Sequence, residues 1–148
     1  MFPIADVHTA GPSKPMRITL FAIGTIYIVM GATMLFDPPL WFFHLVPGVP
    51  ETGPFNGHLV ADAGTFFIAI GVGLLIATGD PVRHVSAIVV AAVAGALHAG
   101  LHLVSHADGA LSLDHMPTET FGIYAPTVVL IVIAVSLRQT SGHAHSGK

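Results

Sequence analysis

The feature that most constrains this chain is a set of four long apolar runs. They cover Ile18 to Phe36, His58 to Thr78, Val85 to Val104 and Phe121 to Leu137. Each run has about 17 to 21 residues, and an α-helix that rises 1.5 Å per residue needs roughly 20 to cross the hydrocarbon of a bilayer. The sequence therefore predicts an all-α integral membrane four-helix bundle, formed by one transmembrane domain (residues 1–148) with a polar tail at 139–148.

The composition agrees with lipid as the main solvent of the chain. Hydrophobic residues make up 53% and charged residues only 9%, which is too apolar for an ordinary soluble surface. The formal net charge is −3 and no basic block is present to neutralise a run of phosphates, so nucleic acid is not an expected partner. Cysteine is absent, which excludes disulfides, thiolate metal sites and cysteine nucleophiles.

The basic residues predict the orientation in the membrane. All five lie in the N-terminal tail, in the loop between the second and third runs, or in the C-terminal tail: Lys14, Arg17, Arg83, Arg138 and Lys148. Basic flanks tend to stay on the cytoplasmic side. We therefore expect both termini in the cytoplasm, in a multi-pass protein of the cell inner (plasma) membrane.

Small residues recur at helical spacing in three of the runs. They are Gly24 and Gly31 in the first, Gly64, Gly71 and Gly73 in the second, and two stripes in the third, Ala91, Gly95, Ala99 and Ala92, Ala96, Gly100. Such spacing lets helix backbones approach closely. We expect a compact bundle with the third helix at its centre, and a second stripe available to another membrane protein or to a second copy of the chain. Pro126 removes a backbone donor and is expected to disturb the fourth helix.

Ten histidines are unusual in so apolar a chain, because imidazole is polar and titrates near neutrality. The second run begins with His58 and Asp62, and the third ends with His98, His102 and His106. Residues four apart share one helix face. Because the second helix enters from the outer side and the third exits there, we expect a side-chain atom of the first set within about 5 Å of His98 or His102.

These five residues predict a metal site that faces outward. Ionisable groups inside membrane spans are costly and usually mark a functional site or path. Imidazoles with a carboxylate at this spacing suit zinc, copper, iron or manganese, with b-type haem as the less favoured cofactor. The carboxylate is alternatively a hydrogen-bond partner of a liganding ring. His115 and Glu119, before the fourth run, are candidates to complete or cover the site.

Three functional hypotheses follow, and no enzyme class, since hydrolase, nucleotide-binding and covalent haem motifs are absent. The first is an accessory or redox-linked membrane protein that binds a transition metal or haem. The second is a proton or cation relay that opens to the outside, although the inner halves of the runs hold few polar side chains. The third is a structural subunit of a membrane complex without a cofactor. For any single histidine here, a hydrogen bond to a neighbouring helix or headgroup is the simpler interpretation.

In length, helix count and its Gly-rich second run GHLVADAGTFFIAIGVGLL, the chain resembles DoxX-like and related small four-helix bacterial membrane proteins. The resemblance concerns general architecture over most of the chain. Those families often carry an acidic residue near the start of this helix, where Asp62 lies here. The resemblance implies the same fold and a redox-linked membrane setting. The run from His98 to His106 is not part of that family pattern.

Overall fold

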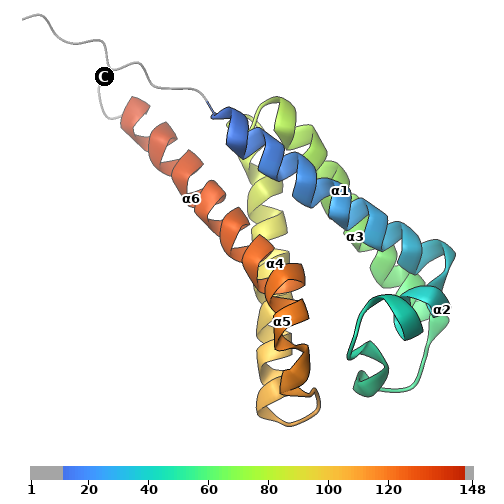
Figure 1. The fold of residues 1–148 in the computed structure, drawn as a ribbon. Helices are drawn as coiled ribbons and strands as arrows, with labels where there is room; N and C mark the ends of the chain where they lie inside the picture. The colour runs from blue at the N-terminus through green and yellow to red at the C-terminus, as the bar shows by residue number, and fades with distance from the viewer. Residues whose placement is uncertain (1–11, 146–148) are drawn as a thin grey trace, which may run out of the picture.

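A computed structural model describes the backbone of residues 12–145 and the side chains of residues 12–139. The long helices are α1 (Lys14–Phe36), α3 (Gly57–Gly79), α4 (Val85–Ala107) and α6 (Ala125–His145) (Figure 1). By length and composition there are four candidate membrane spans, and the last of them runs from Leu113 to Gln139. No strand occurs in this part of the chain. The predicted all-α fold with four apolar spans is confirmed, and the last helix continues to His145, into the predicted polar tail.

Short helical turns occupy the two loops at the far end of the molecule from the start of α1. α2 (Pro38–Leu40), a π-helical turn (Trp41–Leu45) and a 3-10 turn (Val49–Thr52) connect α1 to α3. A second set leads without a break into α6: a 3-10 turn (Leu113–His115), α5 (Met116–Glu119) and a π-helical stretch (Thr120–Tyr124). The fourth span therefore begins earlier than the predicted residue 121.

The π-helical stretch before α6 has a physical cause in Pro126. Proline has no N–H to donate to the carbonyl of Gly122, four residues earlier, and its ring would collide with that carbonyl. A wider turn just before the proline relieves both problems. The disturbance expected at Pro126 thus takes the form of the stretch Thr120–Tyr124.

Glycines allow α1 and α3 to pack more closely than any other pair of helices. A Cβ atom built on Gly31 would lie 2.6 Å from the carbonyl oxygen of Gly64, and one on Gly71 would lie 2.7 Å from that of Gly24. The close packing predicted for these four glycines is confirmed. α4 contacts both α3 and α6, but the tightest contact is not around α4, the helix expected at the centre.

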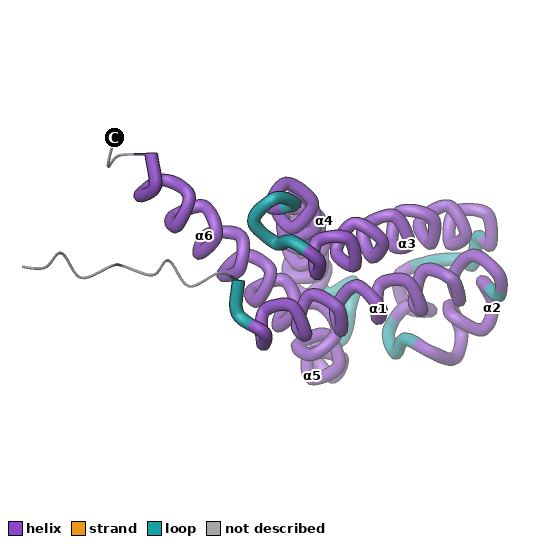
Figure 2. Tube along the Cα trace, turned by 90° about the horizontal axis from the view of Figure 1, so that it is seen from above, coloured by secondary structure: helices purple, strands orange, loops and turns teal. Residues whose placement is uncertain are grey.

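The four helices form two pairs, α1 with α3 and α4 with α6. Figures 1 and 2 show α1 and α3 side by side, and Figure 1 shows this pair diverging from α4 toward the loops at the far end. The main core lies at the opposite end, where α1 begins and α6 ends. Its fully buried side chains come from all four helices: Leu20, Leu74, Ile88 and Leu130. The divergence leaves the polar end of α4 packed against the start of the fourth span and not against α3.

Arg17 joins α1 to α3 at the core end of the molecule. Its guanidinium donates to the carbonyl oxygens of Thr78, at 2.8 Å, and Gly79. The last carbonyls of a helix have no partner within the helix, so a cation there satisfies them and interacts favourably with the helix dipole. Arg17 therefore acts as a cap for α3.

Candidate functional site

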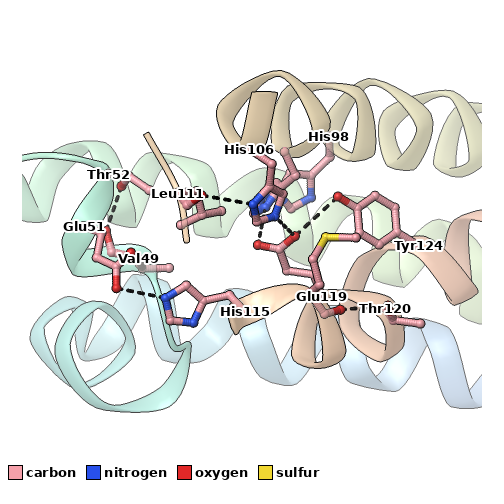
Figure 3. A network of polar contacts seen from close by, with 12 residues as sticks. Val49, Glu51, Thr52, His98, His106, Leu111, His115, Glu119, Thr120 and Tyr124 are labelled. Atoms are coloured by element: carbon pink, nitrogen blue, oxygen red, sulfur yellow. Dashed lines mark hydrogen bonds and ion pairs between the residues drawn. The ribbon is translucent and has the colours of Figure 1, made fainter. Parts of the chain in front are cut away.

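A buried carboxylate, Glu119 at the end of α5, is the centre of a network of histidines (Figure 3). Its residue surface is 6% exposed. Oε2 of Glu119 lies 2.8 Å from Nε2 of His106 and 3.3 Å from the hydroxyl of Tyr124. Oε1 lies 3.0 Å from Nδ1 of His102, whose Nε2 lies 3.1 Å from Nε2 of His98. The side chains thus form one continuous chain of polar contacts.

The turn after α4 brings Glu119 back to the histidines. Gly109 has a φ of 71°, in the left-handed region that favours glycine, and lies two residues after the end of the helix. The N–H groups of Ala110 and Leu111 then donate to the carbonyl of Ser105, at 2.9 and 3.2 Å. The buried Leu111 turns its own carbonyl oxygen to Nδ1 of His106, at 3.1 Å. This reversal sets α5 beside α4 and orients the ring of His106.

Hydrogen-bond chemistry limits where the protons of this network can lie. A carbonyl oxygen only accepts, so Nδ1 of His106 donates to Leu111. Nε2 of His106 and Oε2 of Glu119 then share one proton, which either the ring or the carboxyl carries. One proton likewise lies between the Nε2 atoms of His98 and His102. Each of these two contacts has a proton that either partner can hold, which is the arrangement that proton transfer along a chain requires.

The contact between His102 and Glu119 is close but poorly aligned. Nδ1 of His102 lies 3.0 Å from Oε1, yet it is buried and makes no hydrogen bond of good geometry within the described part of the chain. A buried donor without an aligned partner costs about 1–3 kcal/mol. The contact between His102 and Glu119 is therefore the weakest link in the chain.

The two second-helix residues predicted for the site lie apart from this network. Nε2 of His58 is 3.4 Å from Oδ2 of Asp62, and the two side chains are 88% and 56% exposed. Neither forms a hydrogen bond or ion pair with a histidine of α4 within the described residues. The reason is helical geometry: α3 buries Val60 and Gly64 against α1, and positions two residues away point roughly 200° around the helix. Because the helix pairs diverge at this end, no helix covers the opposite face.

The two residues named as candidates to complete the site have separate roles. Glu119 joins the α4 histidines, whereas the ring of His115 donates from Nε2 to Oε1 of Glu51, at 2.9 Å (Figure 3). This hydrogen bond holds the pKa of the Glu51 carboxyl below its ordinary value. The ring also packs on Gly48, where φ is 86° and a Cβ would lie 2.8 Å from Cδ2 of His115. His115 therefore fastens the two loops to each other and does not extend the network.

We expect acid to release the loop that carries Glu51. Because its folded-state pKa lies below the ordinary value of 4.5, ionised Glu51 stabilises the folded loop above that pH, and this contribution is lost as pH falls through the lower folded pKa. Hydrogen–deuterium exchange of the Glu51 and Thr52 amides measures this contribution to loop stability. At each pH the exchange rates are compared with those of a Glu51→Gln variant. Protection above that of the variant is expected at about pH 6, and this difference should shrink as the pH is lowered below 4.5. Equal protection in both proteins at every pH would contradict the role of the ion pair.

Sequence reasoning did not place Glu119 at the centre of the site, nor did it name Tyr124. A signal was present, since Glu119 is the last charged residue before Arg138, and an acid at the start of so long an apolar segment is costly unless it is paired. From the sequence, Glu119 is only a candidate, together with His115, to complete or cover the site. The contacts of Tyr124 depend on the π-helical stretch, which the sequence did not predict in that form.

Within the part of the chain that the structure describes, no three His, Asp or Glu side chains form a group able to hold a metal ion. Both oxygens of Glu119 face ring nitrogens, and both nitrogens of His106 are engaged. Among the residues of the network, His98 and His102 have Nε2 atoms that face each other at 3.1 Å without an acid between them.

Comparison with known protein families, characterised proteins and solved structures finds no match to this chain. The resemblance to DoxX-like proteins therefore stays an expectation from the sequence.

Proposed function

We propose that this small membrane protein exchanges protons between one membrane surface and the interior of the bilayer, through His106, Glu119, His102 and His98. The observation that carries the proposal is the series of close contacts, 2.8, 3.0 and 3.1 Å, that links these four side chains, of which the middle one is close but not aligned as a hydrogen bond. The three histidines lie on successive turns of α4, so the chain of contacts extends about 12 Å along the helix axis. The positive-inside pattern supports cytoplasmic termini in a plasma membrane, with the His106 end facing outward.

The pathway ends at His98. Beyond it, toward the core end of the helices, lie the fully buried side chains of Leu20, Leu74, Ile88 and Leu130. No hydrogen bond continues from His98 in that direction within the described residues. A series of groups that reaches only mid-membrane delivers protons to the interior of the bilayer and does not carry them across it.

Water exchange of the His98 ring proton tests the proposal. We expect solid-state NMR of ¹⁵N-histidine-labelled protein in lipid bilayers to show this proton exchanging with water, although His98 lies about 12 Å deeper along α4 than His106. Glu119→Gln and His102→Phe should each slow the exchange by roughly tenfold or more, because each removes a link that holds the proton. His84, whose ring bonds to the carbonyl of Asp80 in another loop, is the internal control. Exchange at His98 that is indifferent to both substitutions would rule the relay out.

A transition-metal site at His98 and His102 is a second candidate, favoured by one observation. Their Nε2 atoms are 3.1 Å apart, and two imidazole nitrogens on one tetrahedral zinc ion are about 3.3 Å apart. Glu119 beside the other nitrogen of His102 matches the carboxylate that commonly orients a liganding ring. Water or a second chain would have to supply the remaining ligands, and the same two rings are the candidates for copper, iron or haem b.

The same labelled sample separates this candidate from the relay. Added Zn²⁺ should shift the Nε2 resonances of His98 and His102 and leave that of His106 unchanged, because both nitrogens of His106 already have partners. Elemental analysis and visible spectroscopy of purified protein check for resident metal and haem. Metal content that is the same in a His98→Ala, His102→Ala double variant, with no Soret band in either protein, would exclude the candidate.

A further inference from the structure

A cavity of about 120 Å³ lies between the two helix pairs, beside the last histidine of the network. It is partly open, and it is lined by Tyr27 of α1, Phe67 and Ile70 of α3, and Ala94, Gly95 and His98 of α4. These residues lie near the midpoints of their spans and away from the loops at either end. The opening therefore faces the hydrocarbon of the bilayer.

Two polar atoms of the residues that line this cavity have no partner among the described residues. One is the hydroxyl of Tyr27, and the other is Nδ1 of His98, whose only polar contact is made by Nε2. Polar groups left unpaired in hydrocarbon are costly. When His102 donates to Glu119, its Nε2 accepts from His98, and Nδ1 of His98 is then an acceptor. The wall thus offers one donor, from Tyr27, and one acceptor, from His98.

The remaining wall suits a flat ring. The ring of Phe67 is 5.3 Å from that of Tyr27 and 6.2 Å, edge to face, from that of His98. Aromatic rings at such distances attract a further ring in an offset or edge-on position. An apolar cavity of about 150 Å³ is known to hold benzene. This cavity is smaller, at about 120 Å³, but it is partly open, so a single six-membered ring would enter it with one edge and any substituent left in the lipid.

We propose that this cavity binds a lipid-soluble compound with a hydroxylated aromatic ring. One hydroxyl group both donates and accepts, so it pairs with Nδ1 of His98 and with the Tyr27 hydroxyl at the same time. The inference extends the proposed function, because it names the class of compound that would exchange a proton with His98. It also accounts for a proton pathway that ends in the middle of the membrane.

The test uses 4-fluorophenol as the probe and the full chain in lipid nanodiscs, followed by ¹⁹F NMR. We expect a saturable shift or broadening beyond the partitioning seen with empty nanodiscs. Tyr27→Phe should weaken binding by roughly three- to tenfold, the effect of one hydrogen bond. 4-Fluoroanisole, which has no hydroxyl donor, should bind more weakly than the phenol.

Two alanine-to-leucine variants test whether the probe binds in this cavity. Ala94→Leu places a larger side chain in the cavity and should abolish saturable binding. Ala96→Leu adds the same volume at an exposed position outside the cavity wall and should leave binding unchanged. Signals that match empty nanodiscs, or equal binding by Ala94→Leu and the parent protein, would overturn the proposal and assign the cavity to water or lipid chains.

The outcome is separable from that of the relay. If 4-fluorophenol binds but His98 exchange does not depend on Glu119, the cavity assignment stands and the relay fails. If His98 exchange depends on Glu119 and no saturable binding occurs, the relay stands and the ligand assignment fails.

Discussion

Glu119→Ala is expected to destabilise the folded protein by about 3 kcal/mol, which is the lower end of the cost found when one partner of a buried ion pair is removed. Glu119 is 6% exposed, and its two oxygens face His106 and His102, whose side chains are 6% and 21% exposed. Without the carboxylate, two buried ring nitrogens lose their acceptor. Unfolding by sodium dodecyl sulfate in mixed micelles, followed by circular dichroism, measures the change.

Glu51→Ala is the matched control, because Glu51 also pairs with a histidine but at the surface. Exposed ion pairs contribute little, so this variant should unfold close to the parent protein. Replacing His106 and Glu119 together by leucine should recover part of the loss, because the buried ring of His106 is then no longer left without its acceptor, whereas His102 and Tyr124 still are. If Glu119→Ala is no more harmful than Glu51→Ala, the network does not hold the end of α4 to the fourth span.

Gly31→Ala is expected to destabilise the α1–α3 pair by about 1–3 kcal/mol, the usual cost of overpacking. The added Cβ would meet the carbonyl oxygen of Gly64 at 2.6 Å and the backbone nitrogen of Ile68 at 2.9 Å. Neither atom belongs to a flexible side chain, so the two helices must move apart. The same unfolding titration measures the loss, and Gly64→Ala should behave alike from the other side of the contact.

Gly73→Ala is the control for this prediction. It lies in the same helix as Gly64, but its Cβ would meet only Ala87 Cβ at 3.6 Å, an ordinary contact. Alanine is also the better helix former by about 1 kcal/mol. We expect Gly73→Ala to leave stability unchanged or higher. A loss at Gly73 equal to that at Gly31 would show that helix propensity or lipid contacts, and not the approach of α1 to α3, decide the effect.

The fold was predicted well because its causes are local. A span needs only enough consecutive apolar residues, and close packing at Gly31 and Gly64 needs only the absence of a side chain. Both properties are readable from composition and spacing. Which helices pack against each other could not be predicted in this way. Whether α4 meets α1, α3 or α6 depends on which helix faces fit together over the whole length of the helices.

The candidate site was predicted in part. His98, His102 and His106 do share one face of α4, as their spacing requires. Their partner was expected to be Asp62, because equal membrane depth was the one available guide. Depth restricts two residues to a common level but does not say which way each side chain turns around its helix, and Asp62 is exposed and lies next to His58 instead.

The sequence by itself determined that the chain has four apolar helical spans and that α4 ends in a row of three histidines, because helix length and residue periodicity are properties of the backbone alone. Only the tertiary structure decided which carboxylate the histidines meet. The tight α1–α3 contact turns Val60 and Gly64 inward, which directs His58 and Asp62 outward. The turn at Gly109 then folds Glu119 back onto α4. Such pairings follow from packing between segments distant in sequence, where small differences in helix rotation select one partner over another.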